Sequence, residues 1–114
     1  MCNKEKLNNL TKVLVKKILT TTDKVDRIVI YGSQAKGTSL PESDIDILVI
    51  LNTNEADTRA IKRKLWSISN AVSLDYDEVI SLVVSSKEEY DKMYYSLYNI
   101  NVESEGVELY GRAS

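Results

Sequence analysis

The stretch Ser43–Leu51, Ser-Asp-Ile-Asp-Ile-Leu-Val-Ile-Leu, has two carboxylates near its start and then an uninterrupted apolar run. A nearly continuous apolar run of this length is typical of a strand that is covered on both faces, so the stretch predicts a central strand. Because side chains alternate across a strand, Asp44 and Asp46 are expected on the same face. The stretch therefore predicts the centre of a sheet with a pair of acidic groups at one end.

Two other runs of β-branched and aliphatic residues predict the neighbouring strands. Arg27–Tyr31 is a short run that ends at Gly32, and the segment Asp75–Ser85 contains a further strand. The tail around Gly106 and Gly111 has no pattern that predicts an element. The sheet is therefore expected to have three or four strands.

Apolar residues at helical spacing predict the helices. An amphipathic helix is expected over residues 7–19, and a second helix begins at Asn54 or Asp57, either of which can cap it. The apolar side of the second helix is expected to carry Ile61, Leu65, Trp66 and Ile68. Its basic stretch Arg59–Lys64 is interpreted as a solvated face rather than as an RNA-binding surface.

A final helix is expected after Ser86, which caps it and precedes the acidic residues Glu88 and Glu89 in the first turn. The side chains that this helix presents are Tyr90, Met93, Tyr94 and Leu97. The order of elements predicts an α/β (α+β) fold, in which a small mixed β-sheet of three or four strands is flanked by helices.

The composition limits the kinds of protein and of site. A chain of 114 residues, 43% apolar and 28% charged, fits a single domain over residues 1–114. Its 15 basic and 17 acidic residues give a net charge of -2, which indicates neither a nucleic acid nor a membrane as partner. Histidine is absent, so acid–base or metal chemistry must use carboxylates. A single cysteine, Cys2, and the absence of a signal-peptide pattern favour a cytoplasmic location.

The acidic pair predicts a site for a hard divalent cation. Two carboxylates side by side repel each other unless a cation lies between them, and oxygen ligands without His or Cys suit Mg²⁺ or Mn²⁺. Asp77 precedes the apolar part of the third strand, where it could supply a third carboxylate and draw a proton from an attacking hydroxyl. Asp75, which shares the strand parity of Asp77, and Glu78, through a one-residue bulge, remain alternatives.

The loop that follows the first strand has features that suit a phosphate. Gly32 allows close backbone approach, Ser33 adds a hydroxyl, and Lys36 adds a positive charge. Gly32 and Gly37 have the spacing of a Walker A loop, but Thr38 stands where that loop requires lysine, so a P-loop is excluded.

The pattern Gly32–Gly37, followed after five residues by Ser43–Asp46, resembles the signature of the minimal nucleotidyltransferases of the DNA polymerase β superfamily. The segment Asp77–Ser81 is similar to the third strand of that family, so the resemblance extends over most of the chain. It implies a polymerase β-like nucleotidyltransferase core. It also implies that a nucleoside monophosphate moves from an NTP to an acceptor hydroxyl and that pyrophosphate leaves.

The resemblance also implies roles for individual residues. Asp44 and Asp46 would bind Mg²⁺ (or Mn²⁺), and Asp77 would be the third carboxylate. The nucleotide-binding set would be Gly32, Ser33, Lys36 and Ser43, with ATP as the expected NTP. Lys36 stands where arginine is frequent in the family, which keeps the charge but loses a two-pronged contact.

Small members of this family are often antitoxins that modify a HEPN-type toxin with AMP, so such a toxin is one expected partner. The acceptor site is expected to be shallow or to be completed by another chain. Self-association through the final helix, which carries Tyr90 and Tyr94, is the alternative to a toxin as that other chain. Two further hypotheses use the same residues: a nucleotide-binding module that neutralises or senses a partner by contact, and a metal phosphohydrolase. An Asp46→Asn variant would separate an enzyme from a contact-dependent binder.

Overall fold

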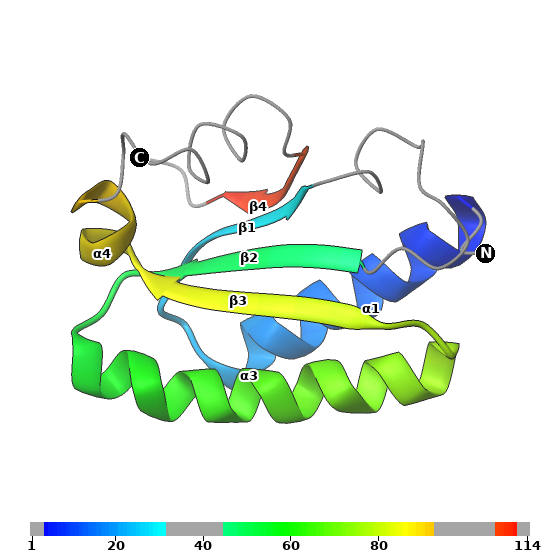
Figure 1. The fold of residues 1–114 in the computed structure, drawn as a ribbon, viewed down its shortest axis with the longest axis horizontal. Helices are drawn as coiled ribbons and strands as arrows, with labels where there is room; N and C mark the ends of the chain where they lie inside the picture. The colour runs from blue at the N-terminus through cyan, green and yellow to red at the C-terminus, as the bar shows by residue number, and fades with distance from the viewer. Residues whose placement is uncertain (1–3, 32–44, 93–106, 112–114) are drawn as a thin grey trace.

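The structure is a computed structural model, which describes residues 4–31, 45–92 and 107–111. Its elements, in chain order, are α1 (Lys4–Thr21), β1 (Val25–Tyr31), β2 (Ile45–Leu51), α3 (Glu55–Tyr76), β3 (Ile80–Ser86), α4 (Lys87–Lys92) and β4 (Val107–Gly111). The four strands form one sheet in the order β3-β2-β1-β4 (Figure 1). This arrangement confirms the predicted mixed sheet flanked by helices.

The sheet is mixed because its strands are joined in two different ways. β1 is antiparallel to both β2 and β4, whereas β3 is parallel to β2. Parallel neighbours need a long crossover, which α3 supplies. As a result, the first residues of β2 and of β3 lie next to each other at the same edge, where Ile45 pairs in register with Ile80.

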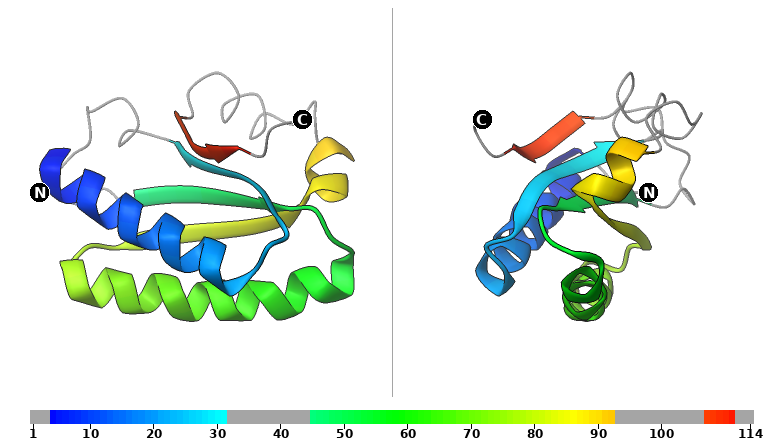
Figure 2. Two further views of the ribbon diagram at one scale, coloured as in Figure 1. Left: turned by 180° about the vertical axis from the view of Figure 1, so that it is seen from behind. Right: turned by 90° about the vertical axis from the view of Figure 1, so that its left-hand side faces the viewer.

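The helices α1 and α3 cover one face of the sheet (Figure 2). On α1 the apolar residues Leu10, Leu14 and Ile18 recur every four positions, and all three are fully buried. They pack with alternate residues of β2, including Ile47 and Val49. This packing fixes which face each β2 side chain occupies. Among the described helices, none has the length and apolar character needed to cross a membrane.

The opposite face, to which Asp46, Leu48 and Ile50 project, is here named the α4 face. A second and smaller cluster on it joins Leu48 and Ile50 to Val29 of β1 and Tyr90 of α4. β2 is therefore covered on both faces over most of its length, as its apolar sequence predicts.

The predicted helix caps are present. The side chain of Asn54 accepts a hydrogen bond from the backbone N–H of Asp57 at 2.8 Å and caps α3. Ser86 Oγ accepts from the N–H of Glu89 at 3.1 Å at the start of α4. α4 carries a buried Tyr90, whereas Met93, Tyr94 and Leu97 lie outside the described residues.

Two expectations about the elements differ from the structure. Trp66 is 45% exposed and does not belong to the buried side of α3, because it lies at the edge of β3 rather than under the sheet. β4 forms in the tail to which the sequence pattern assigned no element. Its pairing with β1 joins residues about 80 positions apart, so no local pattern in five residues could indicate it.

Candidate active site

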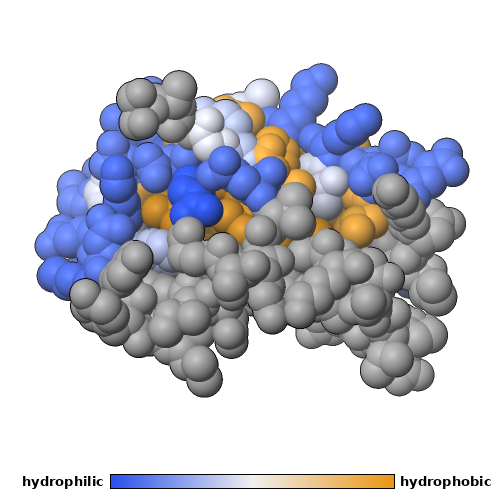
Figure 3. Space-filling model, turned by 90° about the horizontal axis from the view of Figure 1, so that it is seen from above, coloured by the Kyte–Doolittle hydropathy of each residue, from blue (hydrophilic) through white to orange (hydrophobic). Residues whose placement is uncertain are grey.

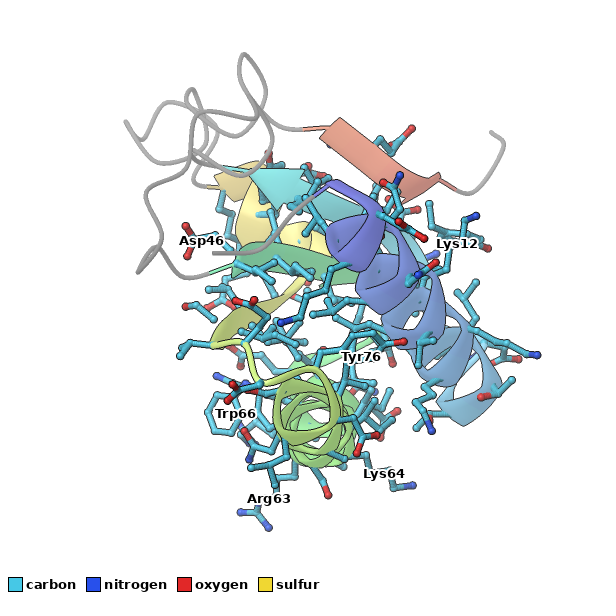
Figure 4. All side chains as sticks on the ribbon, turned by 90° about the vertical axis from the view of Figure 1, so that its right-hand side faces the viewer. Lys12, Asp46, Arg63, Lys64, Trp66 and Tyr76 are labelled. Carbon is cyan, nitrogen blue, oxygen red and sulfur yellow. The ribbon has the colours of Figure 1, made fainter. Side chains whose placement is uncertain are left out.

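Asp46 lies near the start of the central strand, next to both neighbouring strands. It pairs in register with Tyr31 of β1 and with Ser81 of β3. The side chain is half-buried and belongs to the α4 face, because it has the same parity as Leu48 and Ile50. Figure 4 shows Asp46 on the side of the sheet away from α1. The prediction that Asp46 begins a central strand is thus confirmed.

The other half of the predicted signature lies outside the described residues. This holds for Gly32, Ser33, Lys36, Ser43 and Asp44. The points where their segment is attached are described, because β1 ends at Tyr31 and β2 begins at Ile45. Tyr31 pairs with Asp46, so the chain leaves β1 and enters β2 at the end of the sheet that holds Asp46.

Asp77 lies at the same edge but belongs to the end of a helix. It is the C-cap of α3, with the left-handed backbone angles φ 52° and ψ 47°. β3 begins three residues after Asp77. Directly before β3, the carbonyl of Val79 accepts a hydrogen bond from the N–H of Ile45, the first residue of β2, at 2.9 Å. The side chain of Asp77 is exposed. Asp77 thus lies three residues before β3, at the end of the sheet where β2 also begins, and no strand carries it.

The alternatives Asp75 and Glu78 occupy different surroundings. Asp75 lies in the last turn of α3, so the expectation that it shares a strand parity with Asp77 is wrong. The carboxylate of Glu78 forms an ion pair with Lys6 of α1 at 2.9 Å and is only 11% exposed. Its backbone is also fixed, since its carbonyl accepts from the hydroxyl of Ser73. Glu78 therefore faces α1, on the opposite side of the sheet from Asp46.

Ser81 is the residue that the sequence alone did not single out. Its register position beside Asp46 places it on the α4 face, and it is half-buried. A hydroxyl group thus stands on β3 where a strand-borne carboxylate would have to be. The alternation of side chains along β3 indicates which of its residues share a face with Ser81. Only the register between β2 and β3 shows that this is the face of Asp46.

The donor set suits a hard divalent cation. Asp46 offers carboxylate oxygens from a rigid central strand, and Asp77 offers an exposed carboxylate at the same edge. Within the described ranges no three acidic side chains converge: of the five candidates, Asp75 lies in the last turn of α3, Glu78 pairs with Lys6, and Asp44 lies outside those ranges.

Two pockets that the described residues border lie elsewhere. One of about 500 Å³ is lined by residues 19–24 and by the first turns of α3, and another of about 430 Å³ lies between α1 and Leu109 of β4. Neither contains a predicted site residue. The surface that is seen from above shows apolar residues between hydrophilic ones (Figure 3).

Comparison with known proteins places this geometry in a family. The family model described as "Nucleotidyltransferase domain" matches residues 13–108. Two proteins of Methanocaldococcus jannaschii, which carry the provisional name protein adenylyltransferase, are 36% and 32% identical over 87 residues. Each alignment covers 76% of this chain, and it covers 81% and 80% of the respective relative.

Solved structures share the fold. A protein from Sulfolobus solfataricus, provisionally described as a nucleotidyltransferase, superimposes with a TM-score of 0.57 at 19% identity, over 95% of this chain and 86% of the other. A toxin–antitoxin structure with AMP-PNP gives 0.55 at 21% identity, over 87% and 72%. A complex of a tri-AMPylated HEPN toxin of Shewanella oneidensis with an MNT antitoxin gives 0.51 at 19% identity, over 94% and 73%.

The chain belongs to the nucleotidyltransferase domain family, as the signature around Asp46 predicts. It is an enzyme of the nucleotidyltransferase class.

Proposed function

We propose that this chain transfers AMP from ATP to a hydroxyl group of a partner protein and releases pyrophosphate, in a reaction that requires Mg²⁺. The observation that carries the proposal is the position of Asp46. It lies near the start of the central strand, at the end of the sheet where segment 32–44, with its Gly-Ser pair, is attached. The names of the relatives support a protein acceptor, and the structural neighbour with AMP-PNP supports an adenine nucleotide.

The triphosphate is expected at the attachment points of segment 32–44. Gly32 admits a phosphate to the backbone, and Ser33 and Ser43 donate hydroxyl hydrogen bonds to it. Lys36 adds a positive charge. These residues immediately follow β1 and precede β2, so the nucleotide would lie across the ends of two paired strands.

The cation would be held by Asp44, Asp46 and Asp77. Asp44 is two residues before Asp46 and therefore has the parity of the same face. A bound Mg²⁺ would neutralise the phosphate oxygens and favour displacement at the α-phosphorus.

The transfer step assigns a further task to the carboxylate of Asp77. The acceptor oxygen forms a bond to the α-phosphorus, the bond to the bridging oxygen of the β-phosphate breaks, and pyrophosphate leaves. The acceptor hydroxyl loses its proton in this step, and Asp77 accepts it. The exposed position of Asp77 leaves its carboxylate accessible to an incoming hydroxyl.

The partner would be a HEPN-type toxin, as in the Shewanella oneidensis complex, or a second copy of this chain. A cytoplasmic location fits the single cysteine.

The test uses ATP labelled at the α-phosphate, Mg²⁺ and a lysate of the source cells. We expect label on one protein band with the unmodified enzyme and none with Asp46→Asn. Asp75→Asn is the matched control, because it removes an exposed carboxylate near the same edge and should leave transfer unchanged. Removal of Mg²⁺ with EDTA should abolish transfer.

The other outcomes of this experiment separate the alternatives. Release of inorganic phosphate instead of pyrophosphate would indicate a phosphohydrolase. Neutralisation of a partner by both the unmodified protein and Asp46→Asn, without any label, would indicate a contact-dependent binding module. Either outcome would overturn the proposed transfer.

A further inference from the structure

The edge strand next to Asp46 exposes apolar side chains. β3 is the edge strand, and its residue Ser81 is the register partner of Asp46. Val83 follows on the same face and is 37% exposed, while Val79, directly before β3, is 61% exposed. Exposed valines next to a catalytic carboxylate offer contact area but no polar group.

Trp66 extends this apolar area onto α3. Its indole Nε1–H donates a hydrogen bond to the carbonyl of Leu82 on β3 at 3.2 Å, which fixes the ring at the strand edge. The ring is 45% exposed. Figure 4 shows Trp66 on the same side of the molecule as Asp46. An aromatic ring that is held in place and half-exposed loses little freedom when a partner covers it.

Positively charged side chains border the tryptophan. Arg59, Lys62, Arg63 and Trp66 are spaced by three, four and seven positions along α3, so they lie on one side of the helix. The Lys62 ammonium group lies 4.7 Å from the centre of the Trp66 ring. No ion pair joins these three cations to an acidic side chain of the described residues. Lys64 points to the other side of α3 (Figure 4).

We infer that this surface, defined by Arg59, Lys62, Arg63, Trp66, Val79 and Val83, docks an acidic polypeptide segment of the acceptor protein. The inference rests on the proposed function, since it supplies the acceptor site next to Asp46. An apolar side chain of the segment covers Trp66 and the valines, while its carboxylates face the cations. Docking there leaves the acceptor hydroxyl beside the end of the sheet that holds Asp46.

A protein segment suits this surface better than RNA does. The net charge of the chain is -2, and the cations in question occupy one side of one helix. Proteins that bind single-stranded nucleic acid combine a basic groove with several stacking rings, whereas this chain has a single tryptophan beside two valines.

The single tryptophan makes binding at this surface directly measurable. The probe is a random copolymer of glutamate and tyrosine, compared with a copolymer of lysine and tyrosine and with single-stranded polyuridylate. Fluorescence excited where tyrosine does not absorb reports Trp66 alone. We expect the acidic copolymer to protect Trp66 from quenching by acrylamide, and we expect this protection to weaken as salt is added.

Two charge-reversal variants provide the comparison. Arg59→Glu with Arg63→Glu should weaken binding of the acidic copolymer by about tenfold or more, because the rim then repels it. Lys12→Glu with Lys16→Glu is the matched control on α1. It has the same spacing, exposure and change of net charge, and it should leave binding close to that of the unmodified protein.

Each outcome decides the inference. Equal weakening by both double variants, protection by the basic copolymer, or stronger protection by polyuridylate would overturn it. Binding is measured without ATP, so its failure is separate from failure of transfer. Asp46→Asn should keep full binding of the acidic copolymer and lose transfer. Loss of binding with intact transfer to the acceptor would refute the docking surface alone.

Discussion

At the scale of the residue, Asp77 combines an unfavourable backbone with an exposed carboxylate. Left-handed backbone angles are adopted most easily by glycine, and an aspartate in this conformation carries an energetic cost. The residue ends α3 with its N–H directed at the carbonyl of Leu74, a function that glycine performs equally well. The helix end therefore requires the left-handed turn but not the side chain.

The first prediction follows from this combination. Asp77→Gly should leave the free energy of unfolding unchanged or raise it by about 1 kcal/mol, because the strained backbone is relieved. The same variant should lower kcat for AMP transfer by about 100-fold or more, since the group that accepts the proton is lost. Urea unfolding and initial transfer rates measure the two effects.

Asp77→Asn is the control for this prediction, because asparagine also tolerates left-handed angles but cannot accept the proton in the same way. It should be as stable as the unmodified protein and as inactive as Asp77→Gly. Full activity in both variants would show that Asp77 only ends the helix.

The two acidic positions differ in how far the sequence could predict them. Alternation along a continuous apolar strand was sufficient to place Asp46, because the run from Ile47 to Leu51 admits one interpretation. Asp75 and Asp77 depend on where α3 ends, and Leu74, which continues the helix, is 83% exposed. The apolar residues at helical spacing continue through Val72 to Tyr76, shortly before the apolar run of β3, so the local sequence could not indicate where the helix ends.

At the scale of the element, α3 is the long connection that makes β2 and β3 parallel. It spans 22 residues, and its start is fixed by Asn54, whose backbone carbonyl also accepts a hydrogen bond from Thr58 Oγ1 at 2.7 Å. The side chain of Asn54 satisfies a backbone N–H that has no partner within the helix.

Removal of this cap gives the second prediction. Asn54→Ala should lower the free energy of unfolding by about 1 kcal/mol, because the N–H of Asp57 loses its partner. Asn52→Ala provides the control. Asn52 is exposed, and its backbone N–H would still donate to the carbonyl of Lys24, so the loss should stay below about 0.5 kcal/mol. Equal losses in the two variants, measured by urea unfolding, would contradict the assigned cap.

The caps and the strands of the interior were predictable because each has a local signal. Asn54 and Ser86 directly precede helical patterns, and β1 and β2 are dense in β-branched residues. β4 and the exposed position of Trp66 depend on contacts between distant segments, which local patterns do not contain. β4 and Trp66 both lie at the outer strands of the sheet, and an outer strand has a neighbouring strand on one side alone.

At the scale of the whole molecule, the core on the α1 and α3 side joins both helices to the sheet. Leu10, Leu65 and Ile47 belong to the same cluster although they come from different parts of the chain. Elements that share one core are expected to unfold together. We therefore expect residues 1–114 to behave as a single domain.

The third prediction tests this expectation. Far-UV circular dichroism, which reports helices and sheet, and the fluorescence of Trp66, which reports the contact of α3 with β3, should give the same midpoint in urea. A separate transition of Trp66 at lower urea would show that α3 detaches before the rest of the molecule unfolds.

The hydrogen bond between Trp66 and the edge strand also has a consequence for aggregation. β3 (Ile80–Ser86) contains no charged residue, and uncharged edge strands rich in Val, Leu and Ile pair readily with other chains. The indole occupies the Leu82 carbonyl in the middle of this edge, so it obstructs such pairing where the strand has no charge to prevent it. When heat or mutation detaches α3 from β3, the exposed strand becomes a template for intermolecular sheet growth. Thermal denaturation of this protein should therefore end in insoluble β-rich material rather than in refolding.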